Sequence, residues 1–120
     1  MHEVSIAQSL IDVVLDQLRG ERATNEQVTL VRVRIGVFSG VVPAALVSAF
    51  GPASEGTALE AARLQIDVVP LAVWCDACGA EQELPTAGPL HCPKCGTRAA
   101  HVVRGRELEV VSVELGRRPS

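Results

Sequence analysis

Four cysteines in two matched motifs are the residues of this sequence best suited to hold a metal ion. Cys75 and Cys78 form one C-x-x-C pair, Cys92 and Cys95 form the other, and thirteen residues separate Cys78 from Cys92. Each pair is typical of a tight turn that directs two sulfur atoms to one point, and four thiolates suit tetrahedral zinc. Because four sulfurs leave no coordination position open, we predict a structural zinc ion and not a catalytic one.

Other chemistry for these cysteines fits the pattern less well. A thioredoxin-like redox pair needs a single C-x-x-C at the start of a helix, and a disulfide framework needs an oxidising compartment. The sequence has no visible signal peptide and no apolar run of membrane-spanning length, so we expect a cytoplasmic protein with reduced thiols. Gly79 and Gly96 follow the two pairs, where the turn needs a residue that tolerates a positive φ angle.

Two histidines lie near the cysteine motifs. His91 precedes Cys92 directly, and His101 follows a few residues after Cys95. Both can be ordinary surface histidines, or His91 can approach the zinc ion or respond to pH. The sequence leaves both interpretations open.

A second group of metal-binding atoms lies at the first residues, Met1, His2 and Glu3. A free amine, the amide nitrogen of residue 2 and the imidazole can chelate one ion in adjoining rings, and Glu3 can add its amide nitrogen or carboxylate. This nitrogen-rich, square-planar set suits Ni(II) or Cu(II). Taken alone the signal is weak, because a terminal histidine is more often simply solvated.

Alternating and helical apolar patterns predict the elements that position these groups. A helix is expected over residues 4–18, and a second helix is expected from Pro43, with an interruption or kink at Gly51-Pro52. Strands are expected over 28–37, 63–69 and 107–115. In each strand one face is predicted to be buried, and its residues are Val31, Val33 and Ile35 in the first, Leu64, Ile66 and Val68 in the second, and Val111, Val113 and Leu115 in the third.

This order of elements predicts an α+β fold. We expect a small three-stranded mixed sheet with two helices, built from residues 1–70 with 105–120, and an inserted zinc-ribbon-like domain with four cysteine ligands over 71–104. The formal net charge of −3 argues against nucleic acid as a partner. Exposed edge strands allow either a monomer or a weak homodimer.

Several motifs together resemble the HypA/HybF family of hydrogenase nickel-incorporation proteins. The resemblance covers nearly the whole chain and is most specific where Met-His-Glu at the start is combined with the two C-x-x-C-G motifs. The matching segments are Met1–Ala7, Val31–Val41, Glu55–Leu64, the two cysteine motifs, Gly105–Leu108 and Ser112–Glu114.

The resemblance implies a nickel metallochaperone. It implies Ni²⁺ held by the amine of Met1, by His2 and by Glu3, with delivery to the large subunit of [NiFe] hydrogenase and a nickel-handling GTPase, HypB, as working partner. The alternative is a zinc-ribbon module that binds protein or nucleic acid. We expect no enzymatic activity, because the zinc site is saturated and no nucleophile motif is present.

Overall fold

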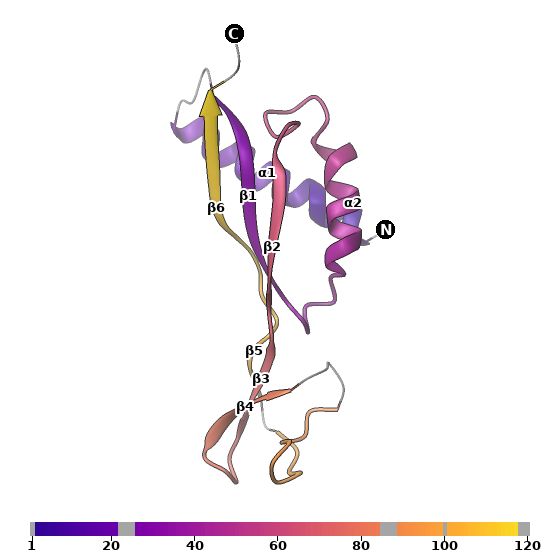
Figure 1. The fold of residues 1–120 in the computed structure, drawn as a ribbon, viewed down its shortest axis with the longest axis vertical. Helices are drawn as coiled ribbons and strands as arrows, with labels where there is room; N and C mark the ends of the chain where they lie inside the picture. Colours follow the sequence, from indigo (N-terminus) through magenta and orange to yellow (C-terminus); the bar gives the residue numbers. More distant parts are fainter. Residues whose placement is uncertain (1, 22–25, 85–88, 100, 118–120) are drawn as a thin grey trace. The chain divides into compact units, whose positions relative to one another are not determined.

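The computed structural model describes residues 2–21, 26–84, 89–99 and 101–117 (Figure 1). The elements within these residues, in chain order, are α1 (His2–Glu21), β1 (Glu26–Gly36), α2 (Pro43–Ser54), β2 (Arg63–Val69), β3 (Leu71–Cys75), β4 (Ala80–Leu84), β5 (His101–Arg104) and β6 (Leu108–Arg117). The chain divides into two compact units. Unit 1 comprises Met1–Val33, Val42–Ile66 and Val110–Ser120, and unit 2 comprises Arg34–Val41 and Asp67–Glu109.

The first helix forms because its apolar residues recur at helical spacing. Ala7, Leu10, Ile11 and Val14 are buried on one side, whereas Val13 on the other side is 50% exposed. The predicted helix is confirmed, and α1 extends it at both ends. It packs against α2 within unit 1.

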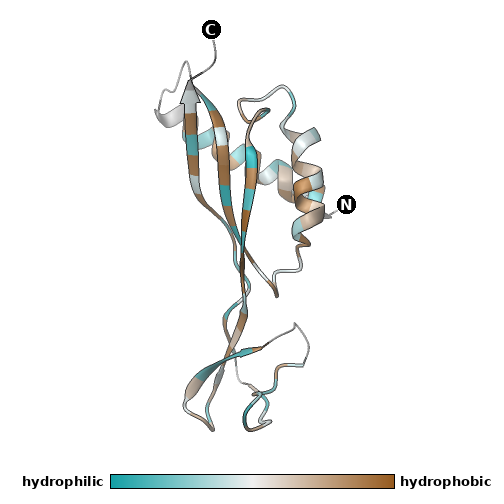
Figure 2. Cartoon of the chain, viewed as in Figure 1, coloured by the Kyte–Doolittle hydropathy of each residue, from teal (hydrophilic) through white to brown (hydrophobic). Residues whose placement is uncertain are grey.

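The sheet of three long strands has the order β2-β1-β6. Figure 1 shows β1 and β2 running in the same direction and β6 running in the opposite direction, with both helices on one face of the sheet. The predicted α+β architecture with a mixed three-stranded sheet is therefore confirmed. Val31, Val33 and Ile35 of the central strand are buried, as their alternation predicts, and Figure 2 shows that alternation along the strands.

The predicted buried faces of the two outer strands are only partly confirmed. Leu64, Ile66 and Val113 are half-buried. Val68 and Val111 are 54% and 48% exposed, and Leu115 is also exposed. The reason is position in the sheet: β2 and β6 each have a single neighbouring strand, so their side chains are covered from fewer sides than those of β1.

The expected interruption of the second helix at Gly51-Pro52 is wrong. Pro43 begins α2 as predicted, but the helix continues through Pro52 to Ser54. Pro52 lies in the last turn, where its missing N–H removes one helical hydrogen bond without breaking many others. The hydroxyl of Ser54 donates to the carbonyl of Gly51 at 2.9 Å and supports the final turn.

Unit 2 contains a second sheet, of order β4-β3-β5, that the sequence did not predict. Strands β3 and β4 form an antiparallel hairpin in register from Leu71↔Leu84 to Cys75↔Ala80, and β5 pairs with the other edge of β3. These strands are four or five residues long and lie in a Gly- and Pro-rich segment, so periodicity alone gives them little signal.

A close backbone crossing lies elsewhere in unit 2. The N–H of Gly36 donates to the carbonyl of Glu107 at 2.8 Å, and the N–H of Phe38 donates to the carbonyl of Gly105 at 2.6 Å. A Cβ atom on Gly36 would lie 2.0 Å from the carbonyl oxygen of Gly105, so only glycine fits at residue 36. In the part of the chain that the structure describes, no helix has the length and apolar character required to cross a membrane.

Candidate metal centre

Two turns of the same geometry carry the four cysteines. In the first, the N–H of Gly79 donates to the carbonyl of Cys75, and in the second the N–H of Gly96 donates to the carbonyl of Cys92, both at 2.8 Å. Gly79 and Gly96 have φ angles of 64° and 77°, which confirms the prediction that each turn needs a residue tolerant of positive φ. The hairpin of β3 and β4 ends in the first turn, so the sheet fixes its position.

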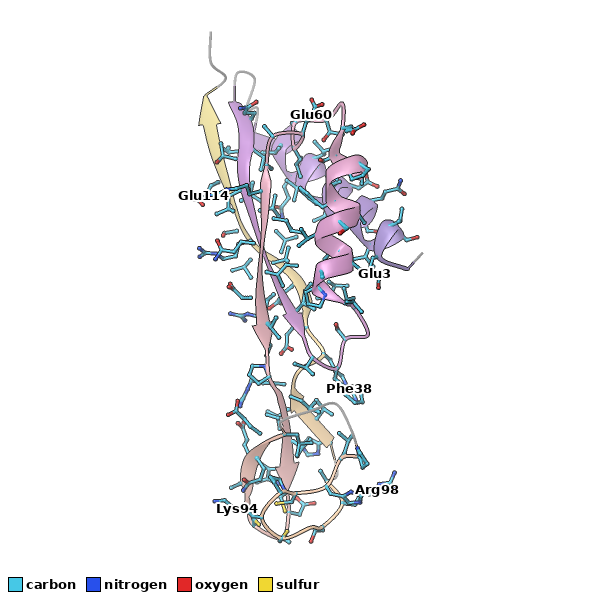
Figure 3. The ribbon with its side chains drawn as sticks, turned by 45° about the vertical axis from the view of Figure 1, so that its right-hand side comes forward. Glu3, Phe38, Glu60, Lys94, Arg98 and Glu114 are labelled. Atoms are coloured by element: carbon cyan, nitrogen blue, oxygen red, sulfur yellow. The ribbon has the colours of Figure 1, made fainter. Side chains whose placement is uncertain are left out.

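The two turns bring all four sulfur atoms together. One ligand atom from each cysteine lies within 4.8 Å of every other, and Figure 3 shows the sulfur atoms gathered near Lys94. The Sγ atoms of Cys75 and Cys95 are 3.5 Å apart, and those of Cys78 and Cys92 are 3.9 Å apart. Tetrahedral zinc with Zn–S bonds of about 2.3 Å separates its sulfurs by about 3.8 Å, so the spacing fits this ion.

Hydrogen bonds make the four thiols electrostatically unequal. The hydroxyl of Thr97 lies 3.3 Å from Sγ of Cys95 and, together with the backbone of Thr97, lowers the pKa of that thiol to about 6 by stabilising the thiolate. Hydrogen bonds to Cys95, Cys75 and Cys92 raise the pKa of Cys78 to about 12. Four thiolates together therefore require a cation that offsets their mutual repulsion.

A small apolar cluster in unit 2 is formed by residues that precede and follow the two turns. Its buried members are Leu71, Val73, Leu84 and Ala99, with Phe38, Leu90 and Val102 packed against them. Two of its members, Leu90 and Ala99, lie on either side of the second turn. They are joined by a backbone hydrogen bond, in which the N–H of Ala99 donates to the carbonyl of Leu90 at 2.7 Å. A cluster of this size gives limited apolar burial, and a bound ion would add to its stability.

The two histidines near the motifs lie on the surface of unit 2. His91 is exposed and pairs with Arg98 in an isolated β-bridge, and His101 is exposed opposite Trp74 in the β3–β5 ladder. Among the described residues, the group that could hold a metal ion consists of the four cysteines alone. A role for His91 at a bound zinc ion stays one of the two interpretations that the sequence leaves open.

The predicted nickel ligands lie partly outside the described residues. Met1 is one of the residues that the structure leaves out, and the same holds for the side chain of His2, whose backbone begins α1. Glu3 is described: it is half-buried in the first turn of α1 and, as Figure 3 shows, lies on the α2 side of that helix.

A groove of 560 Å³ adjoins Glu3 within unit 1. Its walls come from α1 and α2, and its lining residues are Glu3, Val4, Gln8, Ala45, Ser48, Ala49, Pro52 and Ala53. Most of this lining is apolar or small, so it adds few metal-binding atoms to those of the terminus.

Thr97 is a functional candidate that the sequence did not predict. Its position two residues after Cys95 is a signal that could have found it, because a hydroxyl there can reach back to the preceding sulfur. The close approach of Gly36 to Gly105 was equally absent from the predictions, since a contact between residues so distant in sequence leaves no periodic signal.

Comparison with known proteins gives one consistent result. The family model described as "Hydrogenase/urease nickel incorporation, metallochaperone, hypA" matches residues 1–115. The hydrogenase maturation factor HypA of Roseiflexus sp. is 42% identical over 114 residues, which cover 95% of this chain and 91% of that protein. The corresponding protein of Aquifex aeolicus is 40% identical over 115 residues, covering 96% and 97%.

Solved structures match over the same extent. A solution structure of HypA protein aligns with a TM-score of 0.68 at 26% identity and covers 96% of each chain. A solution structure of the Ni metallochaperone HypA from Helicobacter pylori aligns with a TM-score of 0.65 at 23% identity, covering 97% of this chain and 98% of that one, which shows the common fold.

Proposed function

The chain belongs to the HypA family of hydrogenase and urease nickel-incorporation metallochaperones, and on that basis we propose that it binds Ni²⁺ at its amino terminus and delivers the ion during maturation of [NiFe] hydrogenase. The observation that carries the proposal is the family match from residue 1, combined with the chelating sequence Met1-His2-Glu3. Delivery within this family implies contact with maturation partners, and we propose HypB and the hydrogenase large subunit for that role.

The chemistry of the proposed nickel site follows from its donors. The amine of Met1, the amide nitrogen and imidazole of His2, and the amide nitrogen or carboxylate of Glu3 would hold the ion in adjoining chelate rings. A terminal site with backbone donors suits transfer, because an acceptor can replace the ligands one at a time. Glu3 lies in the first turn of α1, so this helix would connect the chelate to the folded body of unit 1.

We also propose that Cys75, Cys78, Cys92 and Cys95 hold a zinc ion with a structural role. The spacing of their sulfurs supports it, and zinc would supply folding free energy to a unit with a small apolar cluster. Because four thiolates would saturate the ion, the chain would have no catalytic centre there.

The alternative of a nucleic-acid-binding zinc ribbon has no specific observation in its favour, whereas the family match spans nearly the whole chain.

An extension placed before Met1 tests the nickel proposal. Such an extension converts the amine of Met1 into an amide, which is a poor ligand, so we expect nickel affinity to fall at least about 100-fold relative to the free terminus. The same extension placed after Ser120 is the control and should leave affinity unchanged. Isothermal titration of zinc-loaded protein measures both. Equal affinity of the two extended proteins for nickel would refute a site that uses the amine.

A further inference from the structure

Two pairs of sulfur atoms, each with one member from either turn, lie close enough for oxidation to join them. We propose that peroxide converts them into a pair of disulfides that join the turns, Cys75 to Cys95 and Cys78 to Cys92, and that this reaction releases the zinc ion. The inference rests on the zinc site proposed above and adds to it a reversible redox response.

Two short sulfur–sulfur distances join the first turn to the second. The sulfur atoms of Cys75 and Cys95 are 3.5 Å apart, and those of Cys78 and Cys92 are 3.9 Å apart. A disulfide has an S–S length of about 2.05 Å, so each pair needs to close by less than about 2 Å. Both movements fall within the adjustments of side chains and turn backbone.

Exposure sets the order of events. Cys78 and Cys95 are exposed, whereas Cys75 and Cys92 are 1% and 2% exposed. Each proposed pair therefore joins one exposed cysteine to one buried cysteine of the other turn. In the zinc-loaded chain all four sulfurs would be thiolates, so peroxide reacts first at the exposed cysteines, and the buried thiolate of the other turn then resolves the product.

The reaction balances for each pair. The exposed thiolate attacks one oxygen of hydrogen peroxide, the O–O bond breaks, and sulfenic acid and hydroxide form. The buried thiolate attacks the sulfenic sulfur, the S–O bond breaks, and a disulfide and a second hydroxide form. Each pair gives up two electrons and consumes one peroxide, and the two hydroxides take protons from the solvent and leave as two waters. Disulfide sulfurs are poor zinc ligands, so the ion departs once its thiolates are consumed.

Cross-linking between the turns has a structural consequence that cross-linking within each turn lacks. Disulfides from Cys75 to Cys95 and from Cys78 to Cys92 hold the first turn against the second, as the zinc ion is proposed to do. Disulfides confined to each C-x-x-C would leave the turns free to separate. The oxidised unit 2 is therefore expected to keep the β4-β3-β5 sheet without metal, and a thiol reductant with zinc restores the starting state.

Peptide mapping of the oxidised full-length protein tests the pairing. The sequence allows every cysteine to be placed on a separate peptide, because Asp-N cleaves before Asp76, Glu-C cleaves after Glu83 and trypsin cleaves after Lys94. Zinc-loaded protein is treated with hydrogen peroxide, free thiols are alkylated, and the digest is analysed by mass spectrometry without reduction. Protein kept under reductant is the control, and it should yield four separate alkylated peptides.

The expected result is release of one zinc ion per chain and loss of four thiol hydrogens, with linked peptides that correspond to Cys75–Cys95 and Cys78–Cys92. Links within the turns, Cys75–Cys78 and Cys92–Cys95, would overturn the inference. Retention of zinc with four free thiols would overturn it as well. Elemental analysis before oxidation distinguishes failure of the zinc site from failure of the redox inference. Protein purified under reductant without zinc contradicts the zinc site itself, whereas zinc-loaded protein with other pairing contradicts only the redox inference.

Discussion

The close crossing at Gly36 is a residue-scale feature whose removal should be costly. In Gly36→Ala the new Cβ would meet backbone atoms of Gly105 and Arg106 at 2.0 to 2.6 Å, and backbone cannot move aside as a flexible side chain can. We expect a loss of about 3 kcal/mol in the free energy of unfolding, measured by urea denaturation.

Gly40→Ala is the matched control for this crossing. Gly40 has a φ angle of 84°, but a Cβ there would meet nothing within 4 Å. Only the backbone conformation is strained, so we expect a loss of about 1 kcal/mol. Equal losses for the two alanine variants would show that the crossing of Gly36 and Gly105 is looser than described.

The hydroxyl of Thr97 should determine how well zinc survives in acid. Together with the backbone of Thr97, it lowers the pKa of Cys95 to about 6, so in the metal-free folded chain this sulfur stays a thiolate until the pH falls to about that value. In Thr97→Val the pKa rises toward its ordinary value, and protons compete with zinc at higher pH. The pH at which half of the zinc is lost to a chelator should therefore rise.

Thr29→Val is the control for the hydroxyl. Thr29 donates a hydrogen bond to the carbonyl of Glu114 at 3.2 Å, but it belongs to unit 1, whereas the four cysteines belong to unit 2. Its zinc-release profile should match that of the wild type. A Thr97→Val profile that coincides with both would contradict the role assigned to the hydroxyl.

At the scale of elements, two adjacent valines of α1 allow the effect of burial on stability to be measured apart from the effect of helix propensity. Val14 is 1% exposed in the core of unit 1, and Val13 is 50% exposed. Val14→Ala should lower the free energy of unfolding by about 2 kcal/mol, because it leaves a cavity in packed surroundings. Val13→Ala should change it by less than about 0.5 kcal/mol. Thermal unfolding followed by circular dichroism measures both, and similar effects would show that α1 does not pack by this face.

The elements differ in how far the sequence predicts them. Helix α1 and strand β1 have long apolar patterns with one clear period, and both were predicted. Strands β3, β4 and β5 are too short for a period to stand out, and their pairing depends on a turn built around Cys75 and Cys78. The end of α2 depends on a local balance: Pro52 removes one helical hydrogen bond, but the hydroxyl of Ser54 supports the same turn.

At the scale of the whole molecule, removal of zinc should affect the two units differently. Unit 1 has a core of its own built from both helices and β1, whereas the apolar cluster of unit 2 is small. A chelator under reducing conditions should therefore change the fluorescence of Trp74, the single tryptophan, which lies in β3. The helical signal in far-ultraviolet circular dichroism should change little. Joint loss of both signals would contradict independent stability of unit 1.

The candidate sites were predictable to different degrees. The cysteine cluster was predictable, because paired C-x-x-C-G motifs determine both the turns and the donor chemistry. The unequal pKa values of the thiols were not, since they depend on Thr97 and on contacts between the turns. The nickel ligands were predicted from resemblance, because the residue types Met1, His2 and Glu3 alone would suit a solvated terminus equally well.

Nickel titration of a histidine variant tests the central proposal most directly. Zinc-loaded wild type and His2→Ala, both with a free Met1 amine, are titrated with Ni²⁺ beside His101→Ala, which removes an exposed histidine of unit 2. Loss of the imidazole ligand should weaken nickel binding at least about 100-fold in His2→Ala and leave His101→Ala like the wild type. Equal nickel affinity of His2→Ala and the wild type would contradict a terminal nickel site.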